Sequence, residues 1–123
     1  MSNNRPFRIK DRIRSFKFAI EGIAVFFRTE HNARIHLFAA VGVLVFAYLF
    51  KVTRMEFCWL IAAIAVVFVT EMINTSIELL CNELTKEINP QIKKIKDISA
   101  GAVLVAVLGS VAIGLLIFIP KLL

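Results

Sequence analysis

The stretch AGAVLVAVLGSVAIGLLIFI, residues 100–119, contains a single polar side chain, Ser110. A helix needs about 20 apolar residues to cross the hydrocarbon core of a bilayer, so this stretch predicts a membrane-spanning helix. Two shorter apolar runs precede it, at residues 37–50 and 57–69. Together the three runs predict three membrane spans in one chain.

The composition also indicates a membrane protein. Of the 123 residues, 59% are hydrophobic and 20% are charged, and the mean hydropathy is positive, which is too apolar for a soluble domain of this size. We therefore expect an all-α integral membrane fold with a single domain over residues 1–123. The formal net charge of +6 comes from basic residues that flank the apolar runs, which indicates anionic lipid headgroups as partners and argues against nucleic acid.

The two shorter runs need polar neighbours to complete helices that cross the membrane. The second run continues through TEMINTSIE, residues 70–78, without a Gly or Pro that would end a helix. Before the third run, Asn89 can cap a helix in which Pro90 takes the first position. We predict helices at about 31–50, 55–84 and 90–119, each containing one span.

The N-terminal region, from about residue 7 to residue 29, has a different pattern. Apolar residues at positions 9, 13, 16, 20, 23 and 27 alternate with basic residues. This spacing predicts an amphipathic helix that lies in the membrane interface. Eight Lys and Arg residues precede the first span, and four more lie between the second and third, so the N-terminus and the second loop are predicted to be cytoplasmic.

Glu71, Asn74 and Glu78 form a polar stripe at the end of the second predicted helix. Their i, i+3, i+7 spacing places them on one face of that helix. A carboxylate near the bilayer centre costs about 3 kcal/mol on insertion scales, so such residues are functional by default. The alternative is that the two carboxylates only pair with Lys or Arg on neighbouring helices. We favour a catalytic site, in which Glu71, the deepest carboxylate, is the base.

Further polar residues are expected at the same depth, because the start of span one, the end of span two and the start of span three all face the cytoplasm. Glu30 precedes the first span, and Lys96 and Asp97 precede the third. Carboxylate oxygens suit Mg²⁺, so Glu30 and Glu78 are candidate ligands. Phosphoryl transfer requires positioning, charge neutralisation and a base, and these residues supply all three without a glycine-rich phosphate loop.

A small oligomeric transporter or channel is the alternative function, since buried carboxylates also couple ion movement. The polar residues, however, gather at one end of the predicted spans. This leaves no polar path through the outer half of the membrane.

Three blocks of the sequence resemble the prokaryotic diacylglycerol kinase family, which includes the undecaprenol kinases of Gram-positive bacteria. These blocks are EHNARIH from Glu30, EMINTSIE from Glu71, and KD at Lys96 and Asp97 followed by AGAVL. The likeness runs from about Ser15 to the C-terminus. It implies an ATP- and Mg-dependent lipid kinase that phosphorylates the primary hydroxyl of diacylglycerol, giving phosphatidic acid, or of undecaprenol, giving undecaprenyl phosphate.

The resemblance also implies roles for individual residues. Glu71 would be the catalytic base, and Glu30 and Glu78 would hold the metal ions. The residues implied to contact ATP are Phe18, Asn74, Glu87, Asn89, Lys96 and Asp97. The residues implied to contact the lipid are Ser15, Ala19, Arg34 and Ala100. A homotrimer with shared active sites is implied as well, in the bacterial inner membrane with the sites on the cytoplasmic side.

The sequence departs from the family pattern at three positions of the N-terminal helix. Ala19 and Glu21 stand where the Gram-negative enzymes carry Ser and Lys, and Asp11 replaces a basic residue. The EHNARIH block and the C-terminal PKLL look more like the undecaprenol kinase branch. Both lipids present a primary hydroxyl at the membrane surface, and the sequence does not show the apolar contacts that discriminate them, so both stay open as acceptors.

Overall fold

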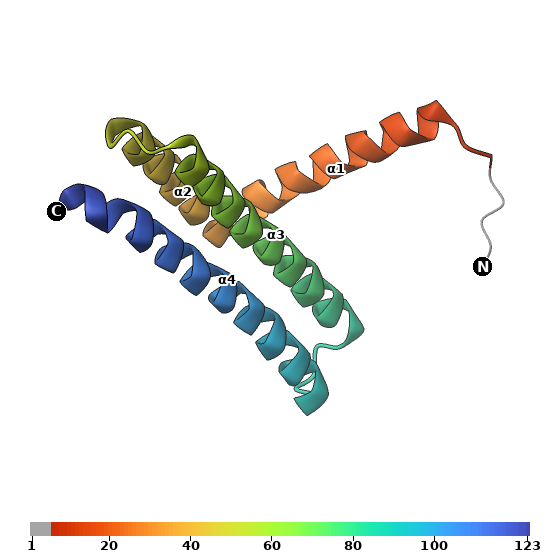
Figure 1. The fold of residues 1–123 in the computed structure, drawn as a ribbon. Helices are drawn as coiled ribbons and strands as arrows, with labels where there is room; N and C mark the ends of the chain where they lie inside the picture. Colours follow the sequence, from red (N-terminus) through yellow and green to blue (C-terminus); the bar gives the residue numbers. More distant parts are fainter. Residues whose placement is uncertain (1–5) are drawn as a thin grey trace. The chain divides into compact units, whose positions relative to one another are not determined.

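The computed structural model describes residues 6–123, which form four α-helices (Figure 1). These are α1 (Ile9–Thr29), α2 (His31–Leu49), α3 (Arg54–Leu84) and α4 (Pro90–Leu122). Three of them, α2, α3 and α4, are long and apolar enough to cross a membrane. The predicted all-helical membrane fold is confirmed. The helices fall into two compact units, Met1–His31 and Asn32–Leu123, and each is described by itself below.

The N-terminal unit consists mainly of α1. Large apolar side chains along this helix, among them Ile13, Phe16 and Ile20, are exposed. The helix ends at Thr29, and the next residue, Glu30, has an extended backbone and donates its N–H to the carbonyl of Phe26 at 3.0 Å. A helix with exposed apolar residues on one face and basic residues on the other has the character of an interfacial helix.

Two local features form the turn between α2 and α3. Lys51 adopts a left-handed conformation with φ 52°, which reverses the chain after α2. Thr53 then caps α3 through a reciprocal pair of hydrogen bonds, because its hydroxyl accepts from the N–H of Glu56 at 3.1 Å and its own N–H donates to the Glu56 carboxylate at 2.9 Å. Lys121 of α4 binds the same carboxylate at 3.0 Å, so both helices are held together at this end.

The turn between α3 and α4 is set by Asn89. Its side-chain oxygen accepts hydrogen bonds from the N–H groups of Gln91 at 2.9 Å and Ile92 at 3.4 Å, and Pro90 occupies the first helical position, as predicted. The helix runs to Leu122, beyond the predicted end at residue 119. Pro120 lies inside the last turn and cannot donate a backbone hydrogen bond there.

The helices of the second unit meet near the α2–α3 turn. Ala47, Leu60 and Ile117, one residue from each helix, form a buried cluster against which Val43 and Phe118 pack. Figure 1 shows α3 and α4 lying side by side. Many other large apolar side chains in these helices are exposed, as expected for surfaces that face lipid or another subunit.

Candidate functional site

The polar face of α3 forms because this helix continues without a break to Leu84. Glu71 is buried, with 5% of its surface exposed, and Asn74 and Glu78 are partly buried. The side-chain nitrogen of Asn74 donates to Oε1 of Glu78 at 3.4 Å. The predicted stripe of Glu71, Asn74 and Glu78 is therefore present as one face of a single helix.

The Glu71 carboxylate is bound from a second helix, α2. Nε2 of His36 lies 2.9 Å from Oε1 of Glu71, in a hydrogen-bonded contact between residues 35 positions apart. Because residues 37–50 are apolar, His36 is the last polar residue before the apolar run of α2. The sequence indicates that His36 lies near the site, but not which residue it contacts.

A further polar atom on this face has no partner. Oδ1 of Asn74 is buried and accepts no hydrogen bond within the part of the chain that the structure describes. A buried carbonyl oxygen beside the Glu78 carboxylate is a suitable donor for a hard cation such as Mg²⁺. Among residues 6–123 no group of three or more His, Cys, Asp or Glu side chains could hold a metal ion. Mg²⁺ sites commonly use only one or two protein carboxylates together with phosphate oxygens.

The loop between α3 and α4 forms an open groove of about 560 Å³. It is lined by Asn82, Thr85, Lys86, Glu87, Ile88, Asn89, Ile92, Lys93, Lys96 and Asp97. Four of the residues predicted to contact ATP, namely Glu87, Asn89, Lys96 and Asp97, thus lie together. The groove presents lysine side chains, which favour an anionic ligand.

Two interactions hold the side chains of this groove. Nζ of Lys96 donates to Oδ1 of Asn82 at 3.1 Å and so joins α4 to α3. One turn earlier, Lys93 pairs with Asp97 at 2.6 Å along the surface of α4. Sequence reasoning did not identify Asn82 as a partner of Lys96.

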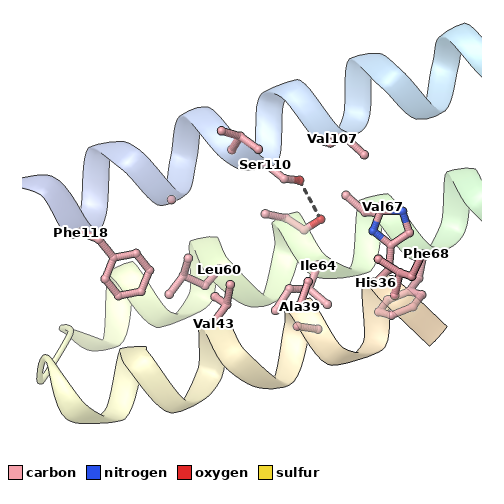
Figure 2. A pocket seen from close by; sticks show the side chains of 15 residues that line it. His36, Ala39, Val43, Leu60, Ile64, Val67, Phe68, Val107, Ser110 and Phe118 are labelled. Carbon is pink, nitrogen blue, oxygen red and sulfur yellow. Dashed lines mark hydrogen bonds between the residues drawn. The ribbon is translucent and has the colours of Figure 1, made fainter. Parts of the chain in front are cut away.

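An apolar groove of about 410 Å³ lies among α2, α3 and α4. Figure 2 shows His36 and Phe68 at one end of this groove and Phe118 at the other. Near its middle, the hydroxyl of Ser110 donates to the carbonyl oxygen of Ala63 at 3.2 Å. Ser110 therefore joins α4 to α3 by a direct hydrogen bond.

The remaining predicted site residues lie elsewhere. Phe18, Ser15 and Ala19 are exposed on α1, and Ser15 donates its hydroxyl to the carbonyl of Asp11. Arg34 is exposed near the start of α2, and Ala100 is exposed on α4. Glu30 follows α1 in the N-terminal unit. The roles of these residues in binding ATP, lipid or metal stay predictions.

Comparison with known proteins gives a family match over most of the chain. The family described as prokaryotic diacylglycerol kinase matches residues 17–118. The chain is 39% identical over 109 residues to the undecaprenol kinase of Bacillus subtilis (strain 168), covering 89% of both sequences. It is 33% identical over 110 residues to the diacylglycerol kinase of Synechocystis sp. (strain ATCC 27184 / PCC 6803 / Kazusa), covering 89% of this chain and 63% of that protein. All the site residues of the second unit lie within the matched region.

Proposed function

The chain belongs to the prokaryotic diacylglycerol kinase family and is an integral-membrane lipid kinase, and we propose that it transfers the γ-phosphate of ATP to the primary hydroxyl of undecaprenol. Diacylglycerol is the second candidate acceptor. Family membership also decides against the transporter or channel that the buried carboxylates alone left open.

The observation that carries the proposal is the order of polar groups along α3. An α-helix rises 1.5 Å per residue, so Glu78 lies about 10 Å along the axis from Glu71, and Asn82 lies about 6 Å further on. The buried carboxylate, the Asn74 and Glu78 pair, and the lysine-lined groove thus follow one another. This spatial order matches the order in which the lipid hydroxyl, the phosphate groups and the rest of the nucleotide would bind along the helix.

Glu71 is the general base in this proposal. Its carboxylate takes the proton from the lipid hydroxyl as that oxygen forms a bond to the γ-phosphorus, while the bond from the γ-phosphorus to the bridging oxygen of ADP breaks. The burial of Glu71 supports this role, because it keeps competing water away from the reacting oxygen.

Mg²⁺ is the proposed metal. Glu78 and the unpartnered carbonyl oxygen of Asn74 would hold it in the second unit. Glu30, in the N-terminal unit, is the other carboxylate that we propose as a metal ligand. When bound, the ion would neutralise negative charge on the phosphates. Lys96 would contribute a fixed positive charge from the α4 side of the groove.

The proposed topology places the N-terminus and the active site on the cytoplasmic side of the bacterial inner membrane. The excess of Lys and Arg before α2 and between α3 and α4 supports this orientation. We further propose a homotrimer, because exposed apolar surface on α2, α3 and α4 leaves room for helices of other subunits and a three-helix unit encloses little of a site by itself.

The choice of undecaprenol rests on sequence likeness. The undecaprenol kinase relative is 39% identical and is matched over 89% of its length, whereas the diacylglycerol kinase relative is 33% identical and matched over 63%. Both acceptors present a primary hydroxyl, so the chemistry at Glu71 is the same for either lipid.

The test uses the purified full-length protein in detergent micelles, supplied with undecaprenol, diacylglycerol or no lipid. We expect ATP consumption to depend on added lipid and to be faster with undecaprenol. Glu71→Gln should lower kcat by about 10² to 10⁴, the usual contribution of a general base. Glu83→Gln, an exposed carboxylate on the same helix, is the matched control and should stay near the wild-type rate. Turnover without lipid, or wild-type turnover in Glu71→Gln, would refute the proposal.

A further inference from the structure

His36 connects α2 to the proposed base on α3. Its Nε2 atom is 2.9 Å from Oε1 of Glu71. A carboxylate that acts as a general base is ionised and only accepts hydrogen bonds, so the proposed role of Glu71 requires the tautomer of His36 that carries its proton on Nε2. His36 is the donor, and Glu71 is the acceptor.

This contact makes the two oxygens of Glu71 unequal. Oε1 accepts the bond from His36, whereas within residues 6–123 no hydrogen bond reaches Oε2. The terminal torsion of a glutamate is broad, so a carboxylate without such a bond samples many orientations. The bond from His36 restricts that torsion and determines which oxygen is left for the substrate.

The surroundings of the contact are apolar. The side chain of Glu71 is 6% exposed and that of His36 is 25% exposed. Figure 2 shows the imidazole beside Val67 and Phe68 at the end of the apolar groove. In a low-dielectric environment a hydrogen bond to a charged group is stronger than in water, so the His36 contact has more influence on the carboxylate here than it would at an exposed surface.

We propose that His36 is a positioning residue for the general base. Its Nε2–H holds Oε1 of Glu71, so that Oε2 accepts the proton of the lipid hydroxyl. The inference rests on the proposed role of Glu71 as the base. Holding the carboxylate in its reactive orientation lowers the entropy that must be lost on the way to the transition state, so it acts on kcat.

The same geometry has a rival interpretation, in which His36 is the proton acceptor and Glu71 only orients it, as a carboxylate orients the histidine of a catalytic triad. Glutamine separates the two roles. Its side-chain amide can donate a hydrogen bond to Glu71 from a similar reach, but it cannot accept the proton of a hydroxyl as a base. A positioning role therefore survives His36→Gln, and a role as base does not.

The experiment compares His36→Leu, which removes the donor, with His36→Gln, which keeps one. We expect His36→Leu to lower kcat about 10- to 100-fold, a part of the 10² to 10⁴ that a general base contributes, with little change in KM for ATP or lipid. His36→Gln should recover most of this loss. Val43→Ala, which alters the same groove at a residue that does not contact Glu71, controls for packing and should keep kcat near wild type.

Thermal unfolding of each variant in detergent separates a folding defect from a catalytic one. In a Glu71→Gln background, His36→Leu should cause no further loss of kcat, because two residues that act through one another are not additive. If Glu71→Gln is inactive and folded His36→Leu keeps the wild-type kcat, the positioning role alone is overturned. If His36→Gln is as inactive as His36→Leu, positioning is overturned in favour of His36 as the acceptor. Wild-type activity in Glu71→Gln overturns the proposed function of Glu71, and the positioning role with it.

Discussion

Replacing Lys96 by methionine tests the proposed nucleotide groove. Methionine keeps the length and apolar stem of the side chain and removes the ammonium group. In the structure this group donates to Oδ1 of Asn82 at 3.1 Å, and both residues line the groove. If Lys96 binds phosphate, Lys96→Met should weaken ATP binding more than it affects the fold.

The expected size follows from the kind of bond that is lost. A hydrogen bond to a charged group contributes about 1.5–3 kcal/mol, and about 1.4 kcal/mol corresponds to a tenfold change in affinity. Lys96 lies in an open groove where solvent screens charge, which places the effect toward the lower end. We therefore expect KM for ATP to rise about 10- to 30-fold, with a smaller change in KM for the lipid.

The assay measures initial rates of lipid phosphorylation over a range of ATP concentrations. Lys94→Met is the matched control, since Lys94 is an exposed lysine two residues away on the same helix that does not line the groove. Its loss should change KM for ATP only slightly, because Lys94 is exposed to solvent, which screens its charge, and does not line the groove. Asn82→Ala removes the hydrogen-bond partner of the Lys96 ammonium group and should raise KM for ATP by an amount between those of the two lysine variants. An unchanged KM in Lys96→Met, or equal effects of both lysine variants, would refute the reasoning.

Two further predictions concern the helix ends and the contact between α3 and α4. Thr53→Ala should destabilise the protein by about 1 kcal/mol, because it removes the cap that Thr53 forms with Glu56. Thr53→Ser keeps the hydroxyl and should leave the stability near that of the wild type, and thermal unfolding in detergent measures both. Equal unfolding temperatures for the two variants would contradict the capping role. Ser110→Ala should lower the free energy of unfolding by about 0.6 kcal/mol, because it removes the hydrogen bond to the carbonyl of Ala63. Ser76→Ala removes a hydrogen bond within one helix and should not weaken packing between helices. The comparison fails if both serine variants unfold alike.

Much of the fold could be predicted from the sequence because it depends on local properties. Apolar runs and the spacing of polar residues reflect how each segment meets lipid or water, and they predicted four helices and three candidate spans. The cap at Asn89 was predictable for the same reason, since it involves neighbours in the chain. The end of α4 was less predictable, because a proline removes a backbone hydrogen bond and so favours a helix end, yet α4 continues past Pro120 to Leu122.

The polar face of α3 was also determined by sequence alone. Once the helix continues past Glu71, its 3.6-residue period places Asn74 and Glu78 on the same side, whatever the other helices do. The contacts that cross between helices are different. His36 bonds to Glu71, Lys96 bonds to Asn82, and their spacing in the chain carries no information about these pairs.

The 20-residue scale of a membrane span and the period of the helix therefore determined from sequence that Glu71, Asn74 and Glu78 lie on one face of α3. Only the tertiary structure decided that the buried Glu71 carboxylate is held by His36 and that Lys96 is held by Asn82. The physical reason is that side-chain pairing between helices depends on the rotation and translation of each helix against its neighbour. Those are set by packing of the whole unit, and no local pattern in the chain encodes them.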